Sequence, residues 1–377
     1  MINVLLVVKR YSGNYPLLNE MARLDPERFR VVVCYLGGQD DGQNSMEGLA
    51  AKTYYLGFSN RQTRMSNVAL LKRLSQIMEA EETHVVNAHL HRTTAPAMVA
   101  ALLAGNRPAV ISTLHGMGSV GTLRRKFANW LIYKKLFKVV GVSHAVRRDI
   151  LESNWNLPEG KVITIQNGLN LEPFLSGPLQ QEARSQVLPG AKAGCWFGTL
   201  GRLSPVKNQR RLIEAFYRVV DVHPDCRLLL AGRGELEGEL KSLTESLGIG
   251  ERVHFLGFRT DVAEILRALD VFLLPSLREG FGLSILEAMA SGLPVIAARV
   301  GGIPEIFCEK PMGNLIDPTD VDALAATMRE LAALPVSERR TLGENARRRA
   351  LDNFSADRMV RHYEQLYLEA WRAGNRH

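Results

Sequence analysis

The sequence contains no long hydrophobic run. Among its 377 residues, none of the apolar segments reaches the roughly 18 residues that a membrane-spanning helix needs. The longest uncharged candidate, residues 93–106, is too short. The opening MINVLLVVKRY has no basic stretch before its apolar core, so it predicts a first β-strand rather than a signal peptide. We therefore expect a cytosolic globular protein.

Cysteine is scarce and scattered. The four cysteines form no C-x-x-C pair, which disfavours a zinc site and a disulfide framework. They stand at positions Cys34, Cys195, Cys226 and Cys308. We expect buried thiols that pack as small hydrophobic side chains.

Hydrophobic residues make up 46% of the chain, enough for packed cores, and the length favours two domains. Short runs rich in valine and isoleucine alternate with helical stretches, as in INVLLVV, FRVVVCYL, HVVNAH, AVISTL, FKVVGVS and KVITIQNG. The alternation restarts with GCWFGTLG, CRLLLAG, RVHFLGF, DVFLLPS and LPVIAA. This pattern predicts an α/β protein with two Rossmann-like, doubly wound parallel sheets.

Breaks in the alternation set the expected boundaries. We predict a first domain over residues 1–172, a linker rich in proline and glycine over 173–192, and a second domain over 193–354. A last helix over 355–377, with Ser355 as its N-cap, could stay on the second domain or cross back to the first. Two such domains facing each other predict a ligand in the cleft between them, at the carboxyl ends of the strands.

The segment EGFGLSILE, residues 279–287, places one acid before a glycine turn and a second acid inside a helix. Glycines at 280 and 282 allow the backbone to approach a ligand closely, and the first amides of the helix favour an anion. Glu287 lies about one turn inside this helix, near enough to accept hydrogen bonds from sugar hydroxyls. Glu279 would face the other end of the same ligand.

Two cations precede this segment in GRLSPVKN, where a strand ends before a helix. Arg202 offers a planar fork and Lys207 a point charge, and both suit a diphosphate. Together with the glycine loop they indicate a site for a nucleotide-diphosphate sugar.

At this point the chain resembles the retaining glycosyltransferases of family 4, which have the two-domain GT-B fold. The resemblance covers most of the chain and is strongest in the second domain. There the two acids spaced as E-x7-E, the strand-end arginine with its lysine, AGRGE, FLGF and GGIPE occur in the order typical of the family.

The resemblance implies roles for individual residues. Arg202 and Lys207 would neutralise the donor diphosphate, Glu287 would bind the ribose, and Glu279 would bind the donor sugar as a catalytic residue. The backbone of the loop would bind the sugar as well, through Gly280, Phe281, Gly282 and Leu283. The base would contact Gly257 and Phe258.

The first domain is less distinctive. Where family members carry paired glycines after the first strand, YSGNYP offers only Gly13 as a donor contact. His115, in STLHGMG, matches a family histidine close to the point of sugar transfer. QNGLN has Asn170 where the family commonly has aspartate, at an expected hinge.

Each of these features has a simpler interpretation. The two acids could be solvated, but the flanking glycines and upstream cations favour a site. His115 could be a hydrogen-bonded residue at a strand end. His89 and His91 have metal-like spacing without a third ligand, so an acceptor-lining or structural role is favoured. The acids in DVD, residues 320–322, open a helix and are expected to act as caps.

The expected function is transfer of a sugar from a nucleotide-diphosphate donor to a hydroxyl acceptor with retention of configuration. Catalysis would rest on charge stabilisation and positioning, with no metal and no cofactor. One alternative is a phosphorylase or a nucleotide-sugar epimerase on the same fold. The other is a non-catalytic sugar-nucleotide or glycan-binding protein, which would have no need for a diphosphate clamp.

A basic, aromatic segment, residues 121–138, suggests where the enzyme works. Its lysines and arginines alternate with aromatic residues and leucine, and the net charge of the chain is +8. Such a helix can lie among anionic lipid headgroups, although it could also pack on the core with cations at its rim. No nucleic-acid module is recognisable. We expect peripheral association with the inner face of a bacterial membrane and a glycan or lipid-linked acceptor, as in lipopolysaccharide core or surface polysaccharide synthesis.

Overall fold

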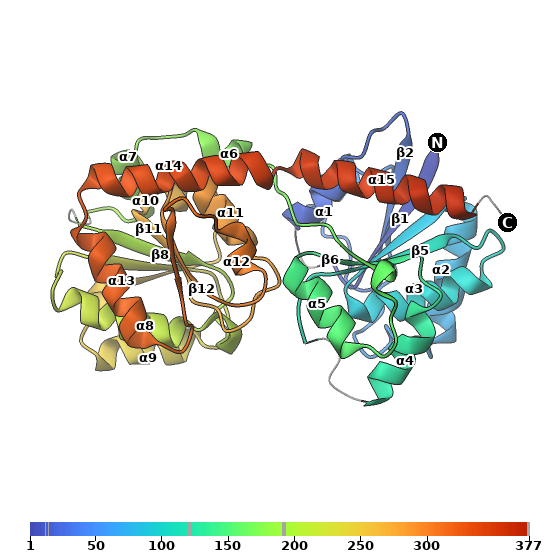
Figure 1. Ribbon diagram of the computed structural model, residues 1–377, viewed down its shortest axis with the longest axis horizontal. Coiled ribbons are helices and arrows are strands. Elements are labelled where there is room, and N and C mark those ends of the chain that lie inside the picture. The colour runs from blue at the N-terminus through green and yellow to red at the C-terminus, as the bar shows by residue number, and fades with distance from the viewer. Residues whose placement is uncertain (12, 14, 119–122, 191–193, 375–377) are drawn as a thin grey trace. The chain divides into compact units, whose positions relative to one another are not determined.

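The computed structural model describes residues 1–377 apart from 12, 14, 119–122, 191–193 and 375–377. The chain divides into two compact units (Figure 1). The first unit combines Met1–Leu169 with Ala356–His377, and the second is Asn170–Ser355. The described part of the chain contains no helix that is both long and apolar enough to cross a membrane.

A seven-stranded parallel sheet forms the centre of the first unit, in the order β3-β2-β1-β4-β5-β6-β7. Its strands are β1 (Ile2–Val8), β2 (Phe29–Tyr35), β3 (Lys52–Tyr55), β4 (Val85–His89), β5 (Ala109–Leu114), β6 (Lys138–Gly141) and β7 (Val162–Thr164). Val4 pairs with Val31 on one side and Val85 on the other. Because both faces of these strands are buried, the sequence reads as continuous apolar runs rather than as an alternation.

Helices cover this sheet on its two faces (Figure 1). They are α1 (Pro16–Met21), α2 (Val68–Ala80), α3 (His91–Leu103), α4 (Leu123–Tyr133), α5 (His144–Ser153) and α15 (Ala356–Gly374), with short 3₁₀ turns at η1 (Ser45–Gly48) and η2 (Glu159–Lys161). The last helix, α15, belongs to this unit although 186 residues of the second unit precede it. Its Tyr363 and Tyr367 are buried, and the Tyr367 hydroxyl accepts a hydrogen bond from Asn87 Nδ2 at 2.7 Å.

The second unit has a six-stranded parallel sheet in the order β10-β9-β8-β11-β12-β13. Its strands are β8 (Trp196–Leu200), β9 (Arg227–Ala231), β10 (Val253–Gly257), β11 (Val271–Leu274), β12 (Val295–Ala298) and β13 (Gly313–Ile316). The strand order reverses between β8 and β11, so the loops after these two strands lie side by side. In open α/β sheets such a reversal is the usual place for a ligand.

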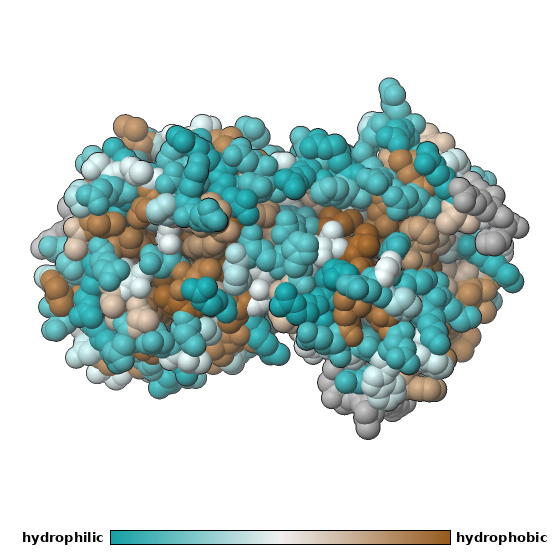
Figure 2. Space-filling model, in the orientation of Figure 1, coloured by the Kyte–Doolittle hydropathy of each residue, from teal (hydrophilic) through white to brown (hydrophobic). Residues whose placement is uncertain are grey.

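The helices of the second unit are α6 (Glu172–Leu175), α7 (Gln180–Val187), α8 (Gln209–Val220), α9 (Glu237–Ser246), α10 (Val262–Ala268), α11 (Leu283–Ala290), α12 (Ile303–Ile306), α13 (Val321–Ala333) and α14 (Val336–Asn353), with 3₁₀ turns at η3 (Pro205–Lys207) and η4 (Gly250–Arg252). Helix α8 shows why they pack: Leu212, Phe216 and Val219 recur every three or four residues and are fully buried, as an amphipathic helix requires. On the face turned to the viewer in Figure 2, hydrophilic side chains cover most of each unit.

The segment expected to be a linker, residues 173–192, differs from the prediction, because it contains the end of α6 and all of α7. Helix α7 packs on α10. Arg184 in α7 forms an ion pair with Asp270 and lies over the Trp196 ring, 4.7 Å from its centroid. The prolines and glycines of residues 173–192 lie outside the sequence QQEARSQV that forms α7, so they flank this helix and do not interrupt it. The boundary between the units falls after Leu169 instead of after residue 172.

Candidate functional site

The glycine loop predicted to bind phosphate lies directly before α11. Gly282 has φ +106°, and a Cβ added there would approach Ile285 Cδ1 to 3.1 Å. Phe281 is buried and packs edge-on against Phe354, with ring centroids 5.6 Å apart. The loop is therefore anchored. The Ile285 amide donates to the Gly282 carbonyl at 3.0 Å, and the amides before it, of Leu283 and Ser284, are ones for which a helix supplies no internal acceptor. This end of α11 is suited to an anion.

Lys207 and Glu279 are brought together by the loops after β8 and β11. Lys207 Nζ lies 2.7 Å from Glu279 Oε2, and the two side chains are 26% and 19% exposed. The amide of Leu277 donates to the Val206 carbonyl at 2.8 Å, which holds the two loops in register. In the free protein the lysine charge is thus balanced by a carboxylate beside the glycine loop.

The loop bearing Lys207 is locked by a residue that the sequence analysis missed. Asn208 adopts the left-handed conformation, with φ +60°, and its Nδ2 donates to the carbonyls of Pro275 and Pro318 at 3.1 and 2.9 Å. The sequence signal that could have indicated it is an asparagine directly before a helix, because asparagine adopts the left-handed conformation more readily than most residues. Asn208 therefore fixes where Lys207 stands relative to the strand ends.

Arg202 lies on the same loop but is more open to solvent. Its guanidinium pairs with Glu235 at 2.8 Å, and its side chain is 72% exposed. The pKa of Glu235 is lowered, first by a backbone hydrogen bond and then by Arg202. Arg202 therefore remains accessible to a ligand.

The glycines of AGRGE allow two backbones to touch. A Cβ at Gly232 would come within 1.9 Å of the Gly201 oxygen, and one at Gly234 within 2.0 Å of the Leu203 oxygen. Leu203 N also donates to the Arg233 carbonyl at 3.1 Å. The resemblance identified this motif but did not explain its glycines. They are needed because the loops after β8 and β9 have no room for a side chain between them.

A cavity of about 330 Å³ opens beside these loops, at the carboxyl ends of β8 and β9. Arg202 and Phe258, both predicted site residues, line it together with Arg233 and Arg259. Phe258 is 71% exposed. Gly257, before it, has φ +67° and accepts a hydrogen bond from the Gly232 amide at 2.8 Å.

Glu287 lies on α11, one turn after the glycine loop. Burial raises the pKa of its carboxyl to about 7, and its side chain has no hydrogen bond or ion pair to any residue that the structure describes. A carboxylate held without a partner is costly. It is therefore poised to accept hydrogen bonds from a ligand's hydroxyl groups.

The first unit carries a pair of histidines at adjacent strand ends. His89 Nδ1 and His115 Nε2 are 3.0 Å apart, and the rings stack with centroids 5.3 Å apart. Burial lowers the pKa of His115 to about 4, while burial and then His115 lower the pKa of His89 well below its ordinary value. Both rings are neutral at pH 7. Whichever ring donates, the pair keeps one further N–H and one further lone pair, because each neutral imidazole has one of each.

The surroundings of this pair and of the other predicted residues of the first unit are as follows. Tyr15, which the sequence analysis did not single out, lies edge-on to His115, with ring centroids 6.3 Å apart. Gly13, exposed in the loop after β1, has φ +99°. His91 Nε2 is 2.8 Å from Asn129 Oδ1. No group of three or more side chains suited to holding a metal ion occurs in the described part of the chain.

The acids of DVD do not gather round a ligand. Asp320 caps α13, accepting from the Ala323 amide at 2.8 Å, as predicted. Asp322 pairs with Arg218 on α8. Both acids therefore have structural partners.

The comparisons with known proteins agree with this geometry. The family model for glycosyl transferases group 1 matches residues 188–349, and the model for glycosyltransferase family 4 matches residues 17–173. A putative glycosyltransferase of Bacillus subtilis, EpsD, is 30% identical over 310 residues, which is 80% of each chain. The chain belongs to glycosyltransferase family 4.

Further similar proteins carry names or bound ligands that involve nucleotide sugars. An Escherichia coli enzyme is named UDP-Gal:alpha-D-GlcNAc-diphosphoundecaprenol alpha-1,3-galactosyltransferase. It is 28% identical to this chain over 323 residues, which is 81% of this chain and 82% of the relative. Among solved structures, Anabaena HepE in complex with UDP-glucose superposes with a TM-score of 0.85 at 22% identity, covering 98% of this chain and 100% of that one. The transferase therefore has the GT-B fold, as predicted.

Proposed function

We propose that this glycosyltransferase moves a sugar from a nucleoside-diphosphate sugar to a hydroxyl group of a glycan or lipid-linked acceptor, with retention of the anomeric configuration. The observation that carries the proposal is the Lys207–Glu279 pair, 2.7 Å apart, beside the glycine loop that opens α11. Lys207 would contact the diphosphate, and Glu279 would contact the sugar attached to it. HepE, of the same fold, was solved with UDP-glucose bound, which supports a donor of this class.

The residues present can carry out the transfer by electrostatics and positioning. Lys207, Arg202 and the first amides of α11 would take up the charge that develops on the departing diphosphate. Glu287 would hold the ribose, and Gly257 and Phe258 would contact the base. The neutral His115 would be the catalytic residue of the first unit, with His89 fixing its ring. No step in this scheme assigns a role to a metal ion.

The test is a transfer assay with a panel of nucleotide sugars and candidate acceptors. We expect release of nucleoside diphosphate that depends on acceptor, continues in EDTA, and gives a product with the donor's anomeric configuration by proton NMR. Conversion of donor without any acceptor would favour the epimerase alternative. Inversion, or loss in EDTA with recovery on adding Mn²⁺ or Mg²⁺, would contradict the proposed mechanism.

We further propose that the enzyme acts at the inner face of a bacterial membrane, in synthesis of lipopolysaccharide core or surface polysaccharide. On α4, Phe127 and Leu131 are 55% and 48% exposed, and the Lys134 ammonium lies 3.9 Å from the centroid of the Trp130 ring. Gly121 falls outside the described residues, as do the side chains of Arg124 and Arg125. Exposed apolar side chains beside lysines suit the headgroup region of a bilayer.

Liposome co-sedimentation tests the membrane proposal. Lysine near an anionic surface contributes about 1 kcal/mol each, so Lys134→Glu/Lys135→Glu should abolish binding that requires anionic lipid and falls with salt. The matched control is Lys72→Glu/Arg73→Glu, an adjacent exposed basic pair on α2, which should bind as the wild type does. Equal recovery of wild type in the supernatant with and without anionic vesicles would contradict membrane association.

A further inference from the structure

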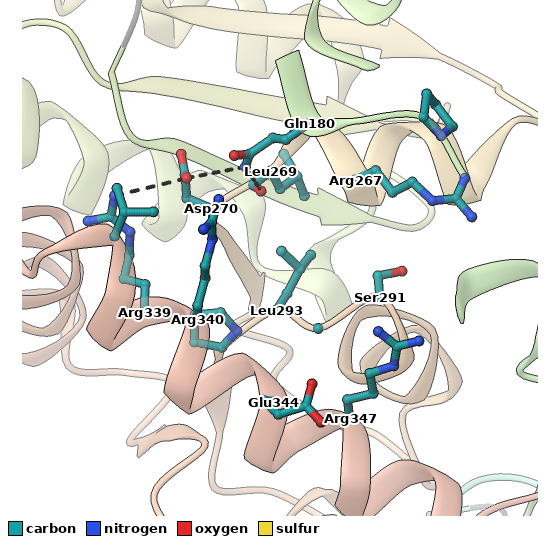
Figure 3. A pocket seen from close by; sticks show the side chains of 14 residues that line it. Gln180, Arg267, Leu269, Asp270, Ser291, Leu293, Arg339, Arg340, Glu344 and Arg347 are labelled. Atoms are coloured by element: carbon teal, nitrogen blue, oxygen red, sulfur yellow. Dashed lines mark hydrogen bonds and ion pairs between the residues drawn. The ribbon is translucent and has the colours of Figure 1, made fainter. Parts of the chain in front are cut away.

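A second pocket lies at the opposite edge of the second sheet from the proposed donor site. It has a volume of about 410 Å³ and is formed by the turn before β11, the turn after α11 and the first turns of α14 (Figure 3). The glycine loop lies at the start of α11, whereas Ser291 and Gly292, directly after its end, line this pocket. The two sites are thus separated by the length of that helix.

The charges lining this pocket are predominantly positive. Four arginines line it, Arg267, Arg339, Arg340 and Arg347. The lining has two acids, and both have partners: Asp270 pairs with Arg184 and, at 4.0 Å, with the lining Arg339, and accepts from the Trp196 amide at 2.7 Å, while Glu344 pairs with Arg348 at 3.3 Å. The arginine charge therefore exceeds the acid charge that is available to balance it.

Three of these arginines are held in place by backbone carbonyls. Arg267 donates to the Pro173 oxygen at 2.7 Å, Arg347 to the Leu175 oxygen at 2.8 Å, and Arg339 to the Leu334 oxygen at 2.5 Å. A carbonyl uses a donor without neutralising the charge. Arg267 and Arg339 also lie near acids, 3.7 Å from Glu264 Oε1 and 4.0 Å from Asp270 Oδ1, whereas Arg347 forms no ion pair with any residue in the described ranges. A guanidinium has five N–H donors, so each of the three is oriented while keeping donors for a ligand.

Gly177 leaves room beside the main chain for one of these arginines, Arg267. A Cβ at Gly177 would come within 2.1 Å of Arg267 Cζ. The glycine therefore lets the guanidinium pass close to the main chain. A side chain there would require the Arg267 guanidinium to move.

Arg340 is the one lining arginine with no such restraint. It is exposed and extends from α14 toward Leu269 and Asp270 in Figure 3. Its side chain makes no hydrogen bond or ion pair with any residue in the described ranges. An unengaged arginine beside three oriented ones leaves the whole fork free for an incoming anion.

We propose that this pocket is a second binding site for a phosphate-bearing anion, distinct from the donor site. Arginine forks match phosphate oxygens in pairs, and the volume falls within the range of small-molecule sites, roughly 300–1,000 Å³. Leu269, Leu293 and Pro294 add an apolar wall for an organic group. The end of α11 would repel an anion through its dipole, but its last carbonyls accept from the Gly292 and Leu293 amides.

The experiment titrates pyrophosphate into the full-length chain carrying ¹³C-labelled leucine and valine methyl groups. Leu269, Leu293 and Val336 report on this pocket, and Leu200 reports on the cavity beside the donor site. We expect saturable shifts at the first three in wild type. In Arg340→Glu the affinity read from them should fall about tenfold or more, because a charged hydrogen-bond donor is replaced by a repelling acid.

Lys310→Glu is the matched control, because Lys310 is exposed on the same unit and does not line the pocket. It should keep wild-type affinity, and Arg340→Gln should give an intermediate one. Equal weakening in Arg340→Glu and Lys310→Glu would show a general charge effect and overturn the proposal. Shifts confined to Leu200 would overturn it as well, without bearing on the transferase activity.

Vesicles containing phosphatidic acid separate the two possible sources of the phosphate. If the ligand is a lipid headgroup, Arg340→Glu should lower vesicle binding relative to wild type even though Lys134 and Lys135 are intact. If it is a soluble phosphate compound, pyrophosphate should shift the pocket methyls while vesicle binding does not depend on Arg340. Failure of both arms would contradict the site.

Discussion

At the scale of single residues, the proposed donor site consists of charged side chains that lie beside the glycine loop. Lys207 is paired with Glu279, and Glu287 stands without a partner in the described structure while burial raises its pKa to about 7. The sequence motif placed both acids near the glycine loop. It could not show that one would be paired and the other desolvated, because those properties depend on Asn208 and on the packing around α11.

The raised pKa of Glu287 predicts how stability depends on pH. An acid whose folded pKa lies above its unfolded value contributes stability below the unfolded value, about pH 4.3, and that contribution is lost as pH rises through the folded pKa, about 7. Glu287→Gln removes this loss. Its free energy of unfolding, relative to wild type, should therefore rise by about 3 kcal/mol between pH 4.5 and pH 8.

Urea unfolding of both proteins at the two pH values measures this difference. Glu279→Gln serves as the control, because Glu279 is paired with Lys207 and should not gain stability with rising pH. A pH-independent difference between Glu287→Gln and wild type would mean that Glu287 ionises normally. In the transfer assay, Glu287→Ala should mainly raise the KM for donor, whereas Glu279→Ala should lower kcat.

At the scale of elements, the loops after β8, β9 and β11 form the site because they lie side by side at the carboxyl edge of one sheet. Close approach of two backbones holds the first two loops together. Gly234→Ala should therefore displace the Leu203 carbonyl, which lies 2.0 Å from the new Cβ position. We expect a loss of stability of about 1–3 kcal/mol and weaker binding of nucleoside diphosphate.

Gly238→Ala gives the matched comparison. Gly238 lies in α9, in the same connection after β9, and a Cβ there meets nothing within 4 Å. This change should stabilise the protein by about 0.5–1 kcal/mol, because alanine favours a helix over glycine. Thermal unfolding measures both variants, and a Gly234→Ala protein as stable and as active as Gly238→Ala would refute the close-packed arrangement.

The sequence predicted most elements, and the two strands that it missed share a physical reason. β3 (Lys52–Tyr55) and β13 (Gly313–Ile316) are short edge strands, and only one side of each is paired in its sheet. Such strands need little apolar sequence. The helix α7 was missed because flanking prolines and glycines suggested a linker, while its support comes from Arg184 and its contacts with Asp270 and Trp196.

At the scale of the whole molecule, the repeated alternation of strands and helices correctly predicted two doubly wound sheets. It left open which unit the last helix would join. The apolar side of α15 predicts burial, but the deciding contacts are distant in sequence: Asn87 with the Tyr367 hydroxyl, and Glu364 with the Asp25 amide at 2.8 Å. Pairings separated by hundreds of residues leave no local pattern from which to predict them.

The central claim is that the carboxyl edge of the second sheet binds a nucleoside diphosphate through Lys207. Isothermal titration of UDP and GDP into wild type, Lys207→Ala and Lys241→Ala tests it most directly. Lys241 also forms an ion pair, 2.8 Å from Glu237 on α9, and so controls for loss of a lysine. We predict that one nucleotide binds wild type and Lys241→Ala equally and binds Lys207→Ala about tenfold or more weakly. Binding of neither nucleotide, or equal binding to all three proteins, would contradict the account.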